Sequence, residues 1–196
     1  MSRMRHWALG AILLLCGTAF AAGEAGLTAS CDACHGKDGV STRQNVPTIA
    51  GISDPVQLDA LKAFRAKTRP CRKVSVHGET GDMCSVAAGL SEAPMMSLAE
   101  HYSKLPYVKM KQPVDAAEAA AGMAIAQRNC SICHSNGGTN PADDAGLLGG
   151  QPLGWLKSVI ADAKDGKLPQ SDVMRQKTSK LSDADVTALA EYYASL

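Results

Sequence analysis

The chain of 196 residues carries 20 Lys and Arg against 19 Asp and Glu, a formal net charge of +1 at pH 7. This length suits one ordinary domain or two small ones. The near-balance of charge, without a clustered basic face, excludes nucleic-acid binding from the functions we consider.

Residues 1–21 are typical of a secretory signal peptide. Arg3 and Arg5 provide the positive start, residues 8–18 the apolar stretch, and residues 19–21 the small-x-small cleavage pattern. The apolar stretch is too short to span a membrane, and no later segment approaches the roughly 20 apolar residues required. We therefore expect a periplasmic protein with no membrane span after cleavage; a retained N-terminal anchor is the alternative.

Residues 22–106 are expected to form a first, all-helical domain. A short helix leads into a Cys-x-x-Cys-His motif at residues 31–35, and a loop rich in Gly, Asn and Asp follows. A loop carrying Met83 precedes a final amphipathic helix, for which Ser91 is the predicted N-cap. Between the two loops, a middle helix is indicated by the apolar residues Leu58, Leu61 and Phe64.

Residues 107–114 are the predicted linker, and residues 115–196 a second domain that repeats the first. Residues 31–35 shifted forward by 99 positions match the motif at 130–134, and residues 83–105 shifted by 91 match 174–196. The difference places an insertion in the first domain, around "RPCRKVSVH". The repeated middle helix contains Trp155, Leu156, Val159 and Ile160, and the matching methionine and N-cap are Met174 and Ser182.

The histidine after the second cysteine decides the chemistry of both motifs. Two cysteines separated by two residues place their sulfurs near the two vinyl groups of one porphyrin edge, and the next imidazole then lies under the iron. The motifs therefore predict two covalently bound haem c groups. The attachment residues are Cys31, Cys34, Cys130 and Cys133, and the proximal iron ligands are His35 and His134.

Cysteine pairs of this kind have two other possible uses. Four thiolates can bind zinc, but zinc pairs usually lie about 15–20 residues apart, whereas these motifs lie in separate repeats. A thioredoxin-like redox pair requires a βαβ setting that the pattern does not show. Haem has a further argument in its favour, because each half has few aromatic residues and a marginal apolar core that a large cofactor would complete.

Met83 and Met174 are the predicted sixth iron ligands because they coincide under the repeat. Both could instead be core side chains. Met95, Met96 and His77 are rivals in the first half, although the two methionines align with the final helix and fit a packing role better. His101 aligns with Tyr192 and is expected to be a packing or surface residue.

Cys71 and Cys84 have no counterpart in the second half. A disulfide between them would close a loop of about 14 residues, worth about 3 kcal/mol in the chain-entropy model. We expect it to hold the Met83 loop against the first haem. The alternative is two separate buried thiols.

Each half resembles a class I cytochrome c domain through the haem motif, the "PTIAG" segment, the methionine loop and the closing "LAxYY" helix. The resemblance implies that a glycine eight residues before each motif lets the first and last helices cross closely. It also implies that the Pro47 carbonyl orients His35, with Gly146 at the equivalent place in the second half. The implied crossing residues are Gly23 with Tyr102 and Gly122 with Tyr193.

The tandem arrangement is similar to two groups of proteins. One is the dihaem cytochrome subunit of flavocytochrome c sulfide dehydrogenase, and the other is the free tandem dihaem shuttle that supplies terminal oxidases. The linker, the second motif segment and the cysteine beside Met83 favour the first group. The resemblance thus implies a non-catalytic electron-transfer subunit that forms a heterodimer with a flavoprotein oxidising sulfide. A different class, a dihaem peroxidase or haem sensor, would need an open iron coordination position.

Overall fold

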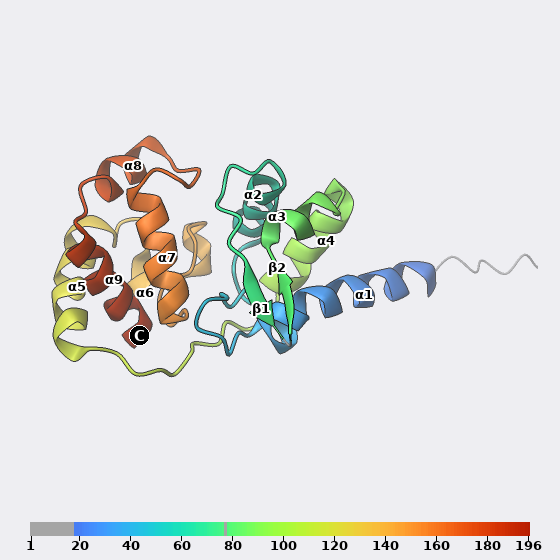
Figure 1. Ribbon diagram of the computed structural model, residues 1–196, viewed down its shortest axis with the longest axis horizontal. Coiled ribbons are helices and arrows are strands. Elements are labelled where there is room, and N and C mark those ends of the chain that lie inside the picture. Colours follow the sequence, from blue (N-terminus) through green and yellow to red (C-terminus); the bar gives the residue numbers. More distant parts are fainter. Residues whose placement is uncertain (1–17, 77) are drawn as a thin grey trace, which may run out of the picture.

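The computed structural model describes residues 18–76 and 78–196, with side chains from residue 26 onward. Most of the predicted signal peptide therefore lies outside the described residues, and α1 begins at its last four positions. Two helical domains lie side by side, with α1 projecting away from the rest of domain 1 (Figure 1). Within the described part of the chain, no helix is long and apolar enough to cross a membrane.

Domain 1 contains the elements α1 (Thr18–His35), η1 (Lys37–Gly39), α2 (Asp54–Arg65), β1 (Val74–Val76), β2 (Glu79–Gly81), α3 (Met83–Ala88) and α4 (Glu92–Ser103). Domain 2 contains α5 (Ala116–Asn129), α6 (Ser135–Gly138), η2 (Pro141–Asp143), α7 (Leu153–Lys164), α8 (Asp172–Thr178) and α9 (Asp183–Ser195). The predicted helical architecture is confirmed, and the middle helices lie where the apolar positions indicated.

The helix starts follow from short polar side chains. At α9, the Ser182 hydroxyl accepts a hydrogen bond from the Asp185 backbone, and the Asp185 carboxylate accepts one from the Ser182 backbone. At α5, the Asp115 carboxylate accepts from the backbone N–H groups of Ala117 and Glu118. Ser91 is the N-cap of α4 as predicted, although its side chain makes no capping hydrogen bond.

The internal repeat is visible in the backbone hydrogen bonds. The Gly39 carbonyl accepts from the N–H groups of residues 49 and 50, and the Gly138 carbonyl accepts from those of residues 148 and 149. Likewise, Gly51 N–H donates to the Tyr102 carbonyl at 2.8 Å and Gly150 N–H to the Tyr193 carbonyl at 2.7 Å. The loop after each haem motif is thus fixed to the last helix of its own domain in the same way.

The first and last helices of domain 2 cross at Gly122. A Cβ atom there would lie 2.9 Å from the Leu189 nitrogen and closer still to the Ala188 carbonyl. Tyr193 on α9 is buried beside this crossing, in the main apolar cluster of the domain. The predicted crossing is confirmed for domain 2, whereas the surroundings of Gly23 in α1 lie outside the described residues.

The insertion in domain 1 forms a short antiparallel hairpin of β1 and β2, which the helical prediction did not include. Three residues a strand are too few for a pattern of alternating polarity to stand out in the sequence. Cys71 and Cys84 form a disulfide, as predicted, so the hairpin is closed onto the first turn of α3.

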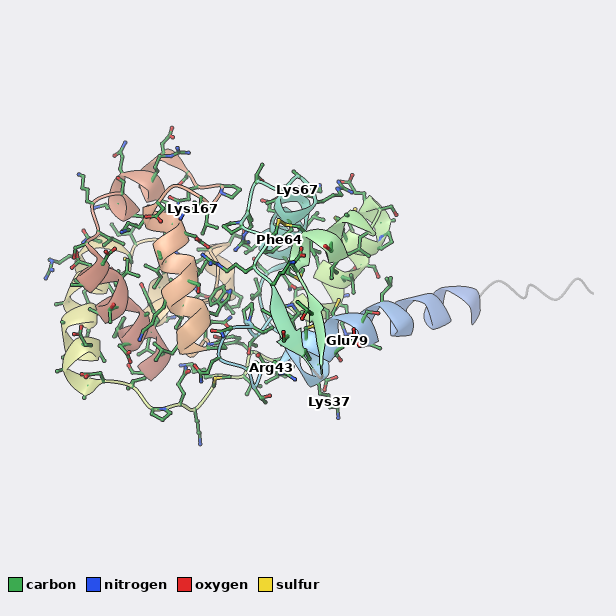
Figure 2. All side chains as sticks on the ribbon, in the orientation of Figure 1. Lys37, Arg43, Phe64, Lys67, Glu79 and Lys167 are labelled. Carbon is green, nitrogen blue, oxygen red and sulfur yellow. A yellow bond between two sulfur atoms is a disulfide. The ribbon has the colours of Figure 1, made fainter. Side chains whose placement is uncertain are left out.

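The two domains also contact each other directly. The Trp155 N–H at the start of α7 donates to the Gln44 carbonyl at 2.7 Å. Beside the disulfide, the Arg72 guanidinium pairs with the buried Asp162 carboxylate of α7, with Nε 3.3 Å from Oδ2. Figure 2 shows side chains from both domains along this interface, with Arg43 and Phe64 on the domain 1 side.

Candidate haem sites

The first motif occupies the last turn of α1, where Cys31 and Cys34 are half-buried and unbonded. His35 is buried, and its Nδ1 lies 2.8 Å from the Pro47 carbonyl oxygen. A carbonyl can only accept, so Nδ1 carries the proton and Nε2 keeps its lone pair. Burial lowers the pKa of His35, which favours the neutral imidazole that an iron ligand requires. The predicted contact between Pro47 and His35 is confirmed.

Asp32, between the two cysteines, joins three parts of domain 1. Its Oδ1 accepts from the Tyr102 hydroxyl at 2.7 Å and from Gly39 N–H at 3.2 Å, and its Oδ2 accepts from Asp38 N–H at 3.1 Å. Burial and this hydrogen bond raise the pKa of Tyr102, which stays protonated as the donor. Asp32 could not be singled out from the sequence, because the residues between the cysteines of such a motif have no fixed role.

The second motif has a different local structure. Helix α5 ends at Asn129, and residues 130–134 form turns in which the Cys130 carbonyl accepts from the His134 N–H. Here Ser131 replaces the aspartate, and its hydroxyl bonds back to the Gln127 carbonyl within the helix. Here the carboxylate comes from the following loop instead, because Asp143 accepts hydrogen bonds from the N–H and hydroxyl of Ser135, directly after the motif.

The His134 imidazole is less well supported than that of His35. Its Nδ1 is buried without a hydrogen-bond partner of normal geometry. Burial lowers the pKa of His134, and the nearby Gly146 carbonyl acts in the opposite direction. Gly146 thus lies beside the histidine as the repeat predicts, but its carbonyl does not reach the close hydrogen-bond geometry that Pro47 has with His35.

The two candidate methionines lie on short helices. Met83 is the first residue of α3 and is half-buried, next to the buried Cys84. Met174 lies in α8 and is 36% exposed. One turn further along α8, Lys177 lowers the pKa of the Cys130 thiol, which places α8 beside the second motif, although burial raises that pKa more.

The rival ligands divide as follows. Met95 is fully buried in α4, which confirms its packing role, whereas Met96 is 54% exposed. His101 contacts Tyr102 edge-on, with ring centroids 5.0 Å apart. His77 lies outside the described residues. Axial ligation by Met83 and Met174 stays a prediction.

These residues fit covalently bound haem. Each motif presents two unbonded cysteines and an imidazole whose pKa is lowered by burial, and the hydrogen bond at His35 Nδ1 leaves the Nε2 lone pair available to iron. The zinc alternative fails among the described residues, because their one cluster of three possible ligands contains the Cys71–Cys84 disulfide and none of the motif cysteines. The orphaned Nδ1 of His134 marks the second site as the less complete of the two.

Comparisons with known proteins identify relatives that are cytochromes. The profile of a family described as cytochrome c oxidase, cbb3-type, subunit III matches residues 117–192. Cytochrome c4 of Azotobacter vinelandii is 30% identical over 92% of this chain and 92% of its own length. A thiosulfate dehydrogenase electron acceptor of Thiomonas intermedia is 28% identical over 85% of this chain and 78% of its own.

A solved structure extends the similarity to three dimensions. Reduced cytochrome c4 from Pseudomonas stutzeri superposes with a TM-score of 0.72 at 26% identity, covering 90% of this chain and 98% of that one. With two haem motifs in two matching domains, the chain binds two covalent haem c groups. It belongs to the cytochrome c4 family of dihaem electron-transfer proteins.

Proposed function

We propose that this chain is a periplasmic electron carrier that receives single electrons from a redox enzyme and passes them on through its two haems. The observation that carries the proposal is the His35–Pro47 hydrogen bond at 2.8 Å, which orients a buried neutral imidazole for iron. The signal-like residues 1–21 and the family relationship support export.

Each residue of the two sites has a defined role in this proposal. Cys31, Cys34, Cys130 and Cys133 form the thioethers, and His35 and His134 bind iron on the proximal side. Met83 and Met174 close the sixth position, which favours electron transfer over oxygen chemistry. Bound haem supplies the reversible one-electron couple, and the protein supplies the ligands and the apolar surroundings that set its potential.

The ligand assignment is tested by substituting each methionine separately. Met83→Ala should change the spectrum of one haem and Met174→Ala that of the other, while the unsubstituted protein should not bind carbon monoxide at neutral pH. Met95→Ala is the matched control, because this buried methionine lies in the packed α4 and should leave both haem spectra unchanged. Carbon monoxide binding to the unsubstituted protein would instead favour a dihaem peroxidase or sensor.

The electron donor divides the proposal into two versions. In the first version, which the linker and the cysteine beside Met83 favour, the donor is a flavoprotein that oxidises sulfide and forms a permanent heterodimer with this chain. The relatives support a second version, a c4-type carrier that serves a separate dehydrogenase, since one of them is described as an electron acceptor of thiosulfate dehydrogenase. Size-exclusion chromatography of the native protein separates the versions, because a stable flavin-containing complex supports the first and a haem-only monomer the second.

A further inference from the structure

Gln151 is a fully buried polar side chain at the interface between the domains. Its Oε1 accepts from the Thr48 N–H and its Nε2 donates to the Thr48 carbonyl, both at 2.9 Å. Thr48 is itself fully buried. The side-chain amide of domain 2 therefore pairs with the backbone of one residue of domain 1, in surroundings where neither group has water as a substitute.

Thr48 directly follows the residue that orients the proximal histidine. The Pro47 carbonyl and the Thr48 N–H belong to the same planar peptide unit. That unit accepts from His35 Nδ1 at one end, at 2.8 Å, and donates to Gln151 Oε1 at the other. A continuous chain of two hydrogen bonds therefore runs from the imidazole through one rigid group to the neighbouring domain.

Hydrogen bonds in such a chain polarise one another. When Gln151 accepts from the Thr48 N–H, the Pro47 carbonyl becomes a stronger acceptor, and the His35 imidazole gains electron density. An iron-ligating histidine that donates more strongly from its other nitrogen is a more basic ligand. A more basic ligand stabilises oxidised iron and lowers the reduction potential.

Among the residues that the structure describes, no equivalent chain of hydrogen bonds reaches His134. Under the repeat, Thr48 corresponds to the buried apolar Leu147, and Gln151 corresponds to Ile52, whose side chain has no amide group. The His134 Nδ1 also lacks a partner of normal geometry. The polarisation of the proximal histidine by the neighbouring domain is therefore expected at the haem of domain 1 and not at that of domain 2.

We propose that Gln151 of domain 2 is a positioning residue for His35, and that it sets the potential of the first haem through the Pro47–Thr48 peptide. This inference rests on the proposed ligation of iron by His35. It makes the potential of one haem depend on the contact between the domains.

The experiment compares two glutamine substitutions in the full dihaem protein. Gln151→Met keeps the side-chain volume and removes both hydrogen bonds to Thr48. Gln112→Met is the matched control. The Gln112 side chain also forms hydrogen bonds near the interface, to the Gln151 and Ala194 carbonyls and from the Leu153 N–H, but none of them is to Thr48. The potentials are measured by spectroelectrochemical titration, with the two haems assigned by NMR.

Gln151→Met should raise the potential of the first haem and leave that of the second unchanged, and Gln112→Met should move neither. The Thr48 amide should also exchange with solvent about tenfold faster in Gln151→Met, since a buried hydrogen bond is lost. Equal shifts of both haems, no shift of either, or an equal effect of Gln112→Met would overturn the proposal. If Gln151→Met does not fold, Thr48 amide exchange in the unsubstituted protein decides, because it should change on reduction of the first haem and not of the second.

Failure of the underlying ligation has a different signature. If His35 were not an iron ligand, His35→Ala would leave the spectrum of the first haem unchanged. If only the role of Gln151 were wrong, His35→Ala would alter that spectrum while Gln151→Met left both potentials in place.

Discussion

Gly122 is the position at which a single methyl group should most clearly disturb domain 2. A Cβ there would lie 2.9 Å from the Leu189 nitrogen and closer to the Ala188 carbonyl, whereas carbon atoms in van der Waals contact lie about 3.5–4.0 Å apart. These are backbone atoms of α9, so they cannot rotate away as a side chain would. The two helices must separate, and the packing of the apolar cluster around Tyr193 must loosen.

The magnitude for Gly122→Ala follows from two opposing terms. Overpacking costs about 3 kcal/mol when the neighbour is rigid, and alanine recovers about 1 kcal/mol of helix propensity relative to glycine. The net loss is about 2 kcal/mol of unfolding free energy, and a protein of this size loses roughly 2–4 °C of Tm per kcal/mol. We therefore expect Tm to fall by roughly 4–8 °C.

The assay is thermal unfolding of the haem-loaded protein, followed by far-UV circular dichroism. Gly26→Ala is the matched control, because Gly26 is also inside the helix that leads to a haem motif but has no atom within 4 Å of its Cβ position. It should keep or raise Tm through helix propensity alone. If Gly122→Ala behaved like Gly26→Ala, the close crossing of α5 and α9 would be wrong.

Two further predictions concern the Met83 loop and the last helix. Replacing Cys71 and Cys84 together by serine should lower the unfolding free energy by about 3 kcal/mol, because the unfolded chain regains the freedom of the closed loop. It should also weaken the methionine-dependent absorption of the first haem while sparing the second; equal spectra before and after would show that the disulfide does not support Met83. At α9, hydrogen bonds from the Ser182 backbone and hydroxyl hold the pKa of Asp185 below its usual value of 3.8. The folded state therefore binds this proton less tightly, so the stabilisation is complete above about pH 3.8 and is lost as the pH falls through the lowered value. Denaturant unfolding should show Asp185→Asn less stable than the unsubstituted protein at about pH 6 and the difference closing toward about pH 2.5; a constant difference would contradict the capping role.

Most residues of the haem sites could be predicted from the sequence, because the motifs that mark them are short and local. The Cys-x-x-Cys-His spacing fixes the attachment chemistry within five residues, and the repeat locates each counterpart in the other half. The contact of His35 with Pro47, 12 residues apart, came from a family resemblance and is confirmed at 2.8 Å. The N-termini of the helices could also be predicted from the sequence, since a capping serine and its acidic partner lie within one turn.

The contacts between the two domains could not be predicted from the sequence in this way. Gln151 and Thr48 are 103 residues apart, and a glutamine followed by a proline carries no pattern that marks it as buried. Arg72 and Asp162 are 90 residues apart, and either could equally have been an exposed surface charge. The conformation of the second motif was missed for a related reason. The two motifs have the same spacing and differ only in the two residues between the cysteines, which are Asp32 and Ala33 in the first and Ser131 and Ile132 in the second.

A repeated chain supplies the same attachment residues and proximal ligand to both haems, so any difference between their potentials must come from residues that are not repeated. These residues are concentrated around the first site: the disulfide beside Met83, Arg72 with its buried partner Asp162, and the hydrogen bonds from Gln151. Two of the three reach across the interface, and through Gln151 the proposed mechanism lets domain 2 influence the first haem. The proposal for Gln151 therefore predicts that a partner that alters how the domains meet shifts the potential of the first haem even if it contacts neither haem.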